Sequence, residues 1–431
     1  MRLAGLLLVA AALVACNGGR SDAPDATPTP AASPTQHPAP TRVIPAAPIA
    51  PAAGDPGRKT PTLPVKLNVG ERRTVRAEGN LPKLTAWKSD DQVSRTPMAA
   101  IGEQAFVVKK SVIKRSPEHP VEYELWNAST NEFTTLWTDP PGTQQAFGVA
   151  EGDWLVTVET GYSLPLARWS LVLRNVTTNE SRTIAESDMR VPDLAEGVQT
   201  GPAGFAPLPA IAGGRVGWIE FFVNAWGTLG KRFQVYDIAS GHTTTLVDIE
   251  DASSSDLQSV SLAANHAAWL GRSRGEPEAW VQTLDSGART VYEIGGDPYS
   301  CALSPDGAFL LWDDTQYAQR GMRAKYALEL STDNVVRYAE GSGWGTYVGG
   351  DLVSWTPWEN AVGFYDFRSD VGYTVDLQGR QSILATVMGD WYVWQETKDT
   401  GVGEQASESV FYFRRQSWSL NATSTNAPGS R

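Results

Sequence analysis

The sequence predicts an all-β protein, a single β-propeller of seven blades with four antiparallel strands each. A six-residue pattern of glycine, apolar residues and a final tryptophan recurs at residues 213–218, 307–312, 350–355 and 389–394. Residues 264–269 lack only the glycine, whereas residues 102–107 and 152–157 lack the tryptophan. The copies start 39 to 61 residues apart, the length that a four-stranded blade occupies. Because the first two copies are weak, six or eight blades remain alternatives.

The clearest unit is residues 257–294, which contain four short segments rich in β-branched and aromatic residues. The segments are residues 260–262, 267–270, 279–284 and 289–292. Asp285-Ser286-Gly287 separates the last two, and glycine there allows the positive φ of a tight hairpin. The repeated tryptophans lie in the second segment of each unit. We therefore expect them to pack between neighbouring sheets.

The last unit offers residues 409–415 as a third strand, but too little chain follows for a fourth strand. Upstream of the first unit, residues 66–88 include Arg73-Thr74-Val75-Arg76, which reads as a strand with no partner nearby in sequence. We expect this N-terminal segment to form the outer strand of the last blade. Such a strand would close the ring and remove an exposed sheet edge.

The N-terminus combines Arg2 with the apolar residues 3–15, a core too short to span a bilayer, so residues 1–15 read as a signal peptide. The sequence Leu13-Val14-Ala15-Cys16 resembles the bacterial lipobox. That resemblance implies lipidation of Cys16 after cleavage and stable attachment to a membrane through acyl chains. Asn17 follows the cysteine, which would favour the outer membrane in a bacterium that has two membranes.

Residues 16–64 are rich in proline, alanine and threonine, and 12 of the 28 prolines of the chain lie in this stretch. Such a composition cannot bury enough apolar surface to fold, so we expect a disordered tether. The propeller is then expected over residues 65–420, with a disordered tail at residues 421–431.

The charge of the chain excludes several partners. The formal net charge is −12, and no basic patch marks a nucleic-acid or anionic-lipid surface. Contact with a membrane is therefore expected through the lipid anchor only, and we expect a monomer. Cys301 has no second cysteine to pair with once Cys16 is lipidated, and its apolar neighbours predict a buried, inert thiol.

The sequence Leu303-Ser304-Pro305-Asp306-Gly307 resembles the propeller repeat of TolB and of the N-terminal domain of the prolyl oligopeptidase family. In those families Ser-Pro-Asp-Gly forms the hairpin between the first and second strands. The resemblance implies a propeller and brings no catalytic residue with it. No Gly-x-Ser-x-Gly elbow is present, so the hydrolase chemistry of the second family is not expected.

The connections between second and third strands are predicted to be long, whereas the other hairpins are short. Propeller geometry places these loops on the same face as the links between blades, and loops carry binding function more often than strands. Candidate binding residues on this face are aromatic or charged: Tyr162, Trp226, Tyr317, Arg320, Arg323, Trp358 and Glu359, with Lys109, Lys110, Lys114 and Arg115 nearby. For any single one of them, packing against its own loop is an equal alternative.

Catalytic and metal-binding patterns are weak. The four histidines are scattered, and no pair has metal-ligand spacing, so we expect no metal and no cofactor. Asp313, Asp314 and Glu359 could supply a carboxylate pair for glycoside hydrolysis, but the sequence gives no distance between them. An enzyme, a glycosidase or lyase, is the weaker alternative, and we assign no catalytic residue.

The sequence thus predicts a bacterial lipoprotein of the cell envelope, anchored to the outer face of the plasma membrane or to the outer membrane. Its propeller is expected to act as a non-catalytic binding or scaffold protein for an envelope protein. A propeller that binds cell-wall or capsule polysaccharide is the alternative, because exposed aromatic side chains also stack on sugar rings.

Overall fold

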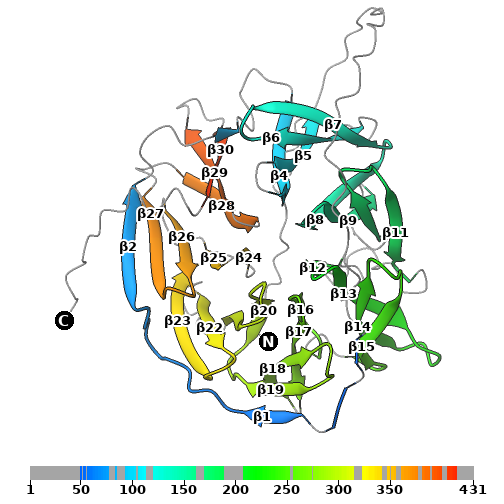
Figure 1. Cartoon of the computed structure of the whole chain (residues 1–431), viewed down its shortest axis with the longest axis vertical. Helices are drawn as coiled ribbons and strands as arrows, with labels where there is room; N and C mark the ends of the chain where they lie inside the picture. The colour runs from blue at the N-terminus through cyan, green and yellow to red at the C-terminus, as the bar shows by residue number, and fades with distance from the viewer. Residues whose placement is uncertain are drawn as a thin grey trace, which may run out of the picture.

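The chain folds as a single all-β propeller. The computed structural model describes residues 49–50, 52–54, 56–76, 83–84, 93–102, 105–112, 120–161, 169–188, 207–252, 256–273, 275–314, 323–341, 347–349, 351–355, 361–376, 381–388, 391–399 and 405–414. All regular structure in this part of the chain is β-strand. The sheets surround a central axis, with the first strand of each on the inside (Figure 1).

Each of the first three blades consists of four consecutive antiparallel strands. The first contains β4 (Val93–Ile101), β5 (Ala105–Val112), β6 (Val121–Asn127) and β7 (Glu132–Asp139). The second contains β8 (Thr143–Glu151), β9 (Trp154–Gly161), β10 (Trp169–Asn175) and β11 (Ser181–Glu186). The third contains β12 (Ala210–Ala212), β13 (Arg215–Val223), β14 (Leu229–Asp237) and β15 (Thr243–Ile249).

Three further blades follow the same order. The fourth contains β16 (Ser259–Leu262), β17 (His266–Ser273), β18 (Glu276–Thr283) and β19 (Arg289–Glu293). The fifth contains β20 (Pro298–Leu303), β21 (Phe309–Asp314), β22 (Arg323–Glu329) and β23 (Asn334–Gly341). The sixth contains β24 (Tyr347–Gly349), β25 (Leu352–Trp355), β26 (Ala361–Asp366) and β27 (Val371–Asp376).

The last sheet is a composite. It joins β28 (Gln381–Met388), β29 (Trp391–Asp399) and β30 (Gln405–Arg414) to β3 (Lys83–Leu84) from the N-terminal region. The expectation of seven equivalent four-stranded blades is therefore corrected to six blades of four consecutive strands and one composite sheet. The two blades that carry β1 (Gly57–Lys59) and β2 (Glu71–Arg76) also gain a fifth strand.

The N-terminal segment 66–88 supplies the outer strand of the last sheet, as predicted, but through β3 and not through residues 73–76. Residues 73–76 belong to β2, which pairs in parallel with β27 of the sixth blade and not with the last sheet. The closing strand is β3, whose Lys83 and Leu84 pair antiparallel with β30. The ladder is only two residues long, whereas β2 matches β27 over six. Local strand propensity identified the segment but could not select its partner.

The repeated glycine-to-tryptophan pattern marks the second strand of every sheet, as predicted. Its described tryptophans Trp218, Trp269 and Trp312 are buried, which confirms their packing role. The leading glycine makes the turn from the first strand. Gly213, for example, has φ of 60°, and a Cβ there would lie 2.7 Å from the carbonyl oxygen of Ala264 in the next blade. Any other residue would strain the backbone and push neighbouring turns apart.

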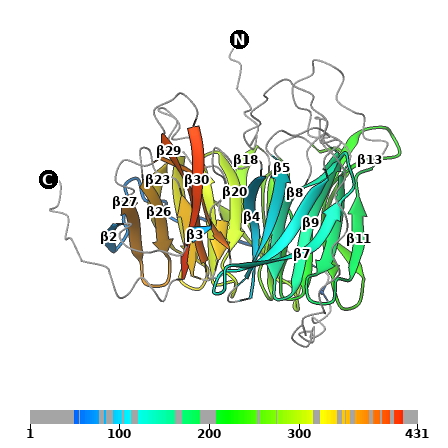
Figure 2. The same ribbon diagram turned by 90° about the horizontal axis from the view of Figure 1, so that it is seen from above.

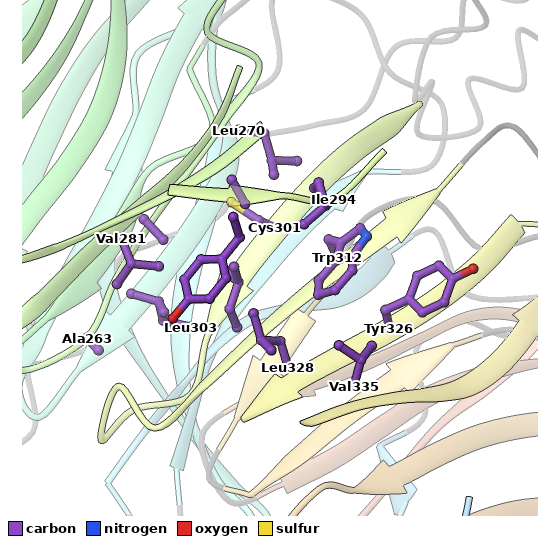
Figure 3. Close-up of a cluster of buried hydrophobic side chains, with 14 of the residues drawn as sticks. Ala263, Leu270, Val281, Ile294, Cys301, Leu303, Trp312, Tyr326, Leu328 and Val335 are labelled. Carbon is purple, nitrogen blue, oxygen red and sulfur yellow. The ribbon is translucent and has the colours of Figure 1, made fainter. Parts of the chain in front are cut away.

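Adjacent blades share apolar cores. Between the fourth and fifth blades, Leu270 and Val281 face Cys301, Leu303 and Trp312 in one buried cluster (Figure 3). Cys301 is buried there as a free thiol, as the sequence predicted. At the ring closure, Phe106 of the first blade lies 5.2 Å from Trp391 of the last sheet, measured between ring centroids. This contact packs the end of the propeller against its beginning.

Residues 49–76 form a strap along the outer rim of the fourth, fifth and sixth blades (Figure 1). Ala50 donates a backbone hydrogen bond to Leu284 at 2.7 Å, and β1 pairs in parallel with β19. The predicted tether therefore extends too far: its described part, from residue 49, lies on the propeller. The proline-rich composition predicted disorder because such a segment cannot form a hydrophobic core of its own. A strap needs no such core, since it can hydrogen-bond to the edge of an existing sheet.

Side chains fix the strap to the blades. Arg58 forms an ion pair with Glu278 at 2.7 Å, and Lys59 pairs with Asp333 at 2.8 Å. The Asn68 side-chain amide bonds to the backbone of β23 as a neighbouring strand would. It accepts a hydrogen bond from the Arg337 N–H at 2.6 Å and donates to the Val335 carbonyl at 3.3 Å. The Asn68 backbone N–H also donates to the Arg337 carbonyl at 3.2 Å, so the outer strand of the fifth blade is bonded to the backbone and side chain of this residue and, in the described chain, to no further strand.

The strands run between two opposite faces of the ring, which are the two ends of the sheets in side view (Figure 2). First-to-second and third-to-fourth connections occupy two to five residues and form what we call the short-turn face. Second-to-third connections, of two to eight residues, lie with the inter-blade links on the opposite long-loop face. These loops are shorter than the sequence predicted, because strand pairing continues into polar residues such as Lys109, Lys110 and Glu159.

Candidate binding face

The predicted binding residues fall into two groups. Trp226 and Arg323 belong to the described part of the chain. Five other candidates, Tyr162, Tyr317, Arg320, Trp358 and Glu359, lie outside the described residues, as do Lys114, Arg115 and the predicted lipidation site Cys16. Lys109 and Lys110 lie on β5 and not in a loop.

Trp226 is the most prominent apolar side chain of the described long-loop face. It is 76% exposed and sits in the turn between β13 and β14. Asn224 organises this turn, because its Oδ1 accepts hydrogen bonds from the Trp226 N–H at 3.0 Å and the Thr228 N–H at 2.9 Å. The indole thus projects from a backbone with fixed geometry, which lowers the entropy lost when a partner binds.

The turn is joined to the acidic link that follows β15. Asn224 Nδ2 donates to the Glu250 carbonyl at 2.8 Å, and the Ala252 N–H donates to the Leu229 carbonyl at 2.9 Å. Glu250 and Asp251 are exposed beside the turn. We call residues 224–228 together with residues 250–252 the third-blade tip. The tip combines an exposed indole with two carboxylates on a hydrogen-bonded frame.

A buried lysine anchors the far end of the same link. Lys231 is 2% exposed, and its Nζ donates to the Leu257 carbonyl at 2.9 Å. Burial lowers the pKa of Lys231 to about 8, although the nearby Asp256 carboxylate favours the charged form. Sequence reasoning missed this residue, because a lysine on a strand normally marks the solvent side.

Arg323 is not a surface residue. It is 7% exposed, and its guanidinium lies 5.0 Å from the Tyr299 ring centroid. Burial lowers the pKa of Arg323, an effect that the Asp313 carboxylate opposes. Its neighbour Lys325 forms a fully buried ion pair with Asp313 at 2.8 Å. These charges hold the strand ends of the fifth blade together, so Arg323 has a packing role and does not offer a contact to a partner.

The carboxylates considered for catalysis have structural partners. Asp313 is paired with Lys325, and Asp314 accepts a hydrogen bond from the Asp297 N–H at 2.9 Å. Glu359, the third member, lies outside the described residues. Both aspartates are buried. This arrangement gives no support to a hydrolytic pair at Asp313 and Asp314.

A polar cluster near the long-loop face joins the first two blades. Gln145 Nε2 lies 3.2 Å from both Asp139 carboxylate oxygens and 3.2 Å from Glu159 Oε2, and the Tyr123 hydroxyl accepts from the Gln145 N–H at 2.8 Å. Burial raises the pKa of Asp139, and the donors Tyr123 and Gln145 oppose this shift. The only sequence signal was a glutamine at an inner-strand position.

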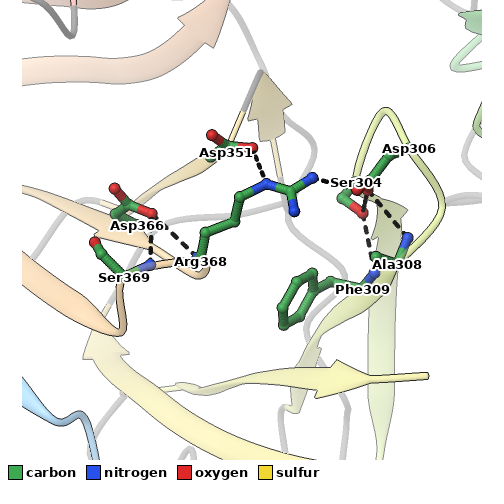
Figure 4. Close-up of polar contacts among 8 residues, drawn as sticks. All are labelled: Ser304, Asp306, Ala308, Phe309, Asp351, Asp366, Arg368 and Ser369. Carbon is green, nitrogen blue, oxygen red and sulfur yellow. Dashed lines mark hydrogen bonds and ion pairs between the residues drawn. The ribbon is translucent and has the colours of Figure 1, made fainter. Parts of the chain in front are cut away.

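The short-turn face contains the Ser-Pro-Asp-Gly turn identified in the sequence (Figure 4). Ser304 Oγ donates to Asp306 Oδ1 at 2.6 Å, and Asp306 pairs with Arg368 of the sixth blade. Arg368 also pairs with Asp351. Burial would raise the pKa of Asp306, but hydrogen bonds from Ser304 and the Ala308 N–H, together with Arg368, lower it. The motif therefore joins two blades.

Two searches of the described residues bear on function. They contain no group of three or more histidine, cysteine, aspartate or glutamate side chains arranged to hold a metal ion. Within the same part of the chain, no helix is long and apolar enough to cross a membrane.

Comparisons with solved structures give matches at low sequence identity. Oligogalacturonate lyase in complex with manganese has a TM-score of 0.52 at 12% identity, over 83% of this chain and 99% of that chain. TolB from Acinetobacter baumannii has a TM-score of 0.38 at 12% identity, over 85% and 96%. A prolyl endopeptidase has a TM-score of 0.49 at 10% identity, over 75% and 50%. No protein-family model matches the chain, and no curated protein matches it.

At such low identity the likeness to the lyase shows the fold alone. It agrees with the class that the strands define, a single all-β propeller whose sheets surround one axis. The fold implied by the sequence resemblance is therefore confirmed. The activity of the lyase and its manganese are properties of that protein, and function here must be argued from the site.

Proposed function

We propose that this chain is a lipid-anchored propeller of the bacterial envelope that binds a partner protein through its long-loop face, without catalysing a reaction. The observation that carries this proposal is Trp226, a large apolar side chain that is 76% exposed on a hydrogen-bonded turn. Tryptophan is among the residues that contribute most to binding at protein interfaces. A rigid turn that exposes an indole to water has no evident value for the stability of the fold.

The anchor is part of the proposal. The N-terminal pattern ending at Cys16 supports lipidation, and the described chain joins the propeller only from residue 49. Residues 17–48 would then connect the membrane to the strap. A Cys16→Ser variant should leave the membrane fraction and should not incorporate labelled fatty acid. Fatty-acid labelling that persists in this variant would contradict lipidation of Cys16 and would leave the proposed binding role of the long-loop face unaffected.

Crosslinking in intact cells, followed by mass spectrometry, tests the binding role. The wild-type chain should capture an envelope protein, and Trp226→Ala should lower its recovery by about tenfold or more, the loss expected at an interface hot spot. Ser286→Ala, in an exposed turn of the short-turn face, is the matched control and should behave as the wild type. Recovery of no envelope protein above background, with the anchor intact, would contradict the proposal.

The polysaccharide alternative predicts a different result. On a glycan array, selective retention of the purified propeller that is abolished by Trp226→Ala would favour sugar stacking over protein binding. We expect no such retention.

A further inference from the structure

We infer that the third-blade tip docks into an apolar pocket rimmed by lysine and arginine side chains on a partner protein. This inference rests on the proposed function and specifies the chemistry of the partner. Three features carry it: the exposed indole of Trp226, the frame that fixes its position, and the exposed carboxylates beside it, which form no ion pair within the described chain.

The indole and its frame define the apolar part of the contact. The Asn224 side-chain amide donates hydrogen bonds within both segments of the tip, to the Thr228 hydroxyl at 2.6 Å and to the Glu250 carbonyl at 2.8 Å. Gly227 has φ of 79°, and its N–H donates to the Asn224 carbonyl at 3.1 Å. A turn held at this many points presents Trp226 as a single projecting knob. Its natural complement is a concave apolar pocket.

The carboxylates define the rim. Glu250 and Asp251 are exposed, and neither forms an ion pair with any residue of the described chain. Asp248, two residues earlier, differs because Arg232 neutralises it at 3.1 Å. Two adjacent uncompensated charges beside an anchor repel acidic surfaces and attract basic ones. A basic rim on the partner would pair with both carboxylates around the buried indole.

The negative charge of the tip also favours a basic protein over other ligands that bind an exposed tryptophan. Anionic lipids and uronic-acid polysaccharides would place like charges against Glu250 and Asp251, on a chain whose formal net charge is −12. Neither would gain from the carboxylates. A protein with a basic rim gains from both the indole and the carboxylates, so it fits the tip better.

The test places a photo-reactive benzoyl-phenylalanine at Ala225, next to Trp226, in the full-length chain in cells. Ala225 is exposed, so the probe leaves the indole in place. We expect crosslinks to a protein whose crosslinked surface carries lysine or arginine around an apolar pocket. The Glu250→Lys/Asp251→Lys variant should lower the yield by about fivefold or more, since complementary charge steers association. With the purified partner, the association rate should fall as salt rises.

Matched controls isolate the charge effect. Glu132→Lys/Glu180→Lys makes the same charge change at exposed positions of the short-turn face and should leave the yield unchanged. Crosslinks at Ala225 whose yield is unchanged in the Glu250→Lys/Asp251→Lys variant would overturn the inference and leave the proposed function standing. No crosslink at Ala225 would overturn both. Trp226-dependent sedimentation with phosphatidylglycerol vesicles or retention on polygalacturonate would also overturn the inference.

Discussion

Lys231 shows how a single buried side chain can lower the free energy of unfolding of the fold that contains it. Its amine is buried at the base of the link between the third and fourth blades, where it donates a hydrogen bond to the Leu257 carbonyl oxygen. Because the pKa in the folded state is about 8, below the ordinary value of 10.5, the unfolded chain holds this proton more tightly than the folded chain. The group therefore lowers stability below pH 8.

The sign of the pH dependence follows from this difference. Between pH 8 and 10.5 the unfolded state binds more protons, so the free energy of unfolding should rise with pH by up to about 3 kcal/mol from this group. In Lys231→Met that contribution should be absent. Denaturant unfolding at pH 7.5, 8.5 and 9.5, compared with the exposed-site control Lys66→Met, measures it. Parallel pH profiles for Lys231→Met and the wild type would contradict the assignment.

Cys301 gives a second prediction at this scale. Burial raises the pKa of its thiol to about 12, so almost no thiolate exists at pH 8 in the folded protein. We expect a maleimide to leave the native chain unlabelled over hours and to label Cys301 within minutes in denaturant. Rapid labelling of the native Cys16→Ser variant, in which no other cysteine remains, would show that the core around the fourth and fifth blades opens readily.

At the scale of elements, short turns have different roles on the two faces of the ring. On the short-turn face, the turn containing Asp306 is bound to the sixth blade through Arg368. On the long-loop face, the described hydrogen bonds of the turn containing Trp226 join residues of that turn to one another and to Glu250, in the link that follows β15. The first arrangement stabilises the ring, whereas the second leaves an aromatic side chain available for contact.

The rigidity of the turn at Trp226 can be tested by substituting Asn224, the side chain that organises it. Asn224→Ala removes the acceptor for the Trp226 and Thr228 N–H groups, and each such bond contributes about 1 kcal/mol locally. We expect faster hydrogen exchange at those amides and lower crosslinking from Ala225, with little change in global stability. Asn224→Asp keeps the acceptor and should retain more protection. Unchanged exchange in Asn224→Ala would show that the turn is held by other contacts.

At the scale of the whole molecule, the strap turns a ring of similar sheets into one unit. It pairs with the fourth and sixth blades, contacts the fifth through Asn68, and leads to β3 in the last sheet. Leu63 and Val69 pack from the strap against the cores of the blades beneath. Stability of the propeller therefore depends on a segment that lies before its first blade.

Truncation tests this dependence. Removal of residues 1–48 should leave the melting temperature unchanged, because it keeps every described contact of the strap, from Ile49 and Ala50 onward. Removal of residues 1–76 deletes β1, β2 and the apolar contacts of Leu63 and Val69. The loss of about 3 kcal/mol of apolar burial should lower the melting temperature by about 5 °C. Equal melting temperatures for the two truncations would show that the strap is dispensable.

Much of the fold could be read from the sequence, and particular residues show why. Trp218, Trp269 and Trp312 recur at the spacing of a blade, and local alternation identified the strands around them. Arg323 and Lys231 were not predictable as buried charges, because burial depends on partners that are distant in sequence. Glu278, for example, pairs with Arg58 across 220 residues of chain.

The sequence by itself determined the repeating unit, since strand periodicity, turn residues and the tryptophan pattern are all local properties. Tertiary structure alone decided which edge each N-terminal segment occupies: β2 lies on the sixth blade, β3 lies on the last sheet, and the proline-rich stretch becomes a strap. It also decided which polar residues remain exposed. The physical reason is that free backbone groups at a sheet edge accept many extended segments, so the partner is chosen by the geometry of the closed ring.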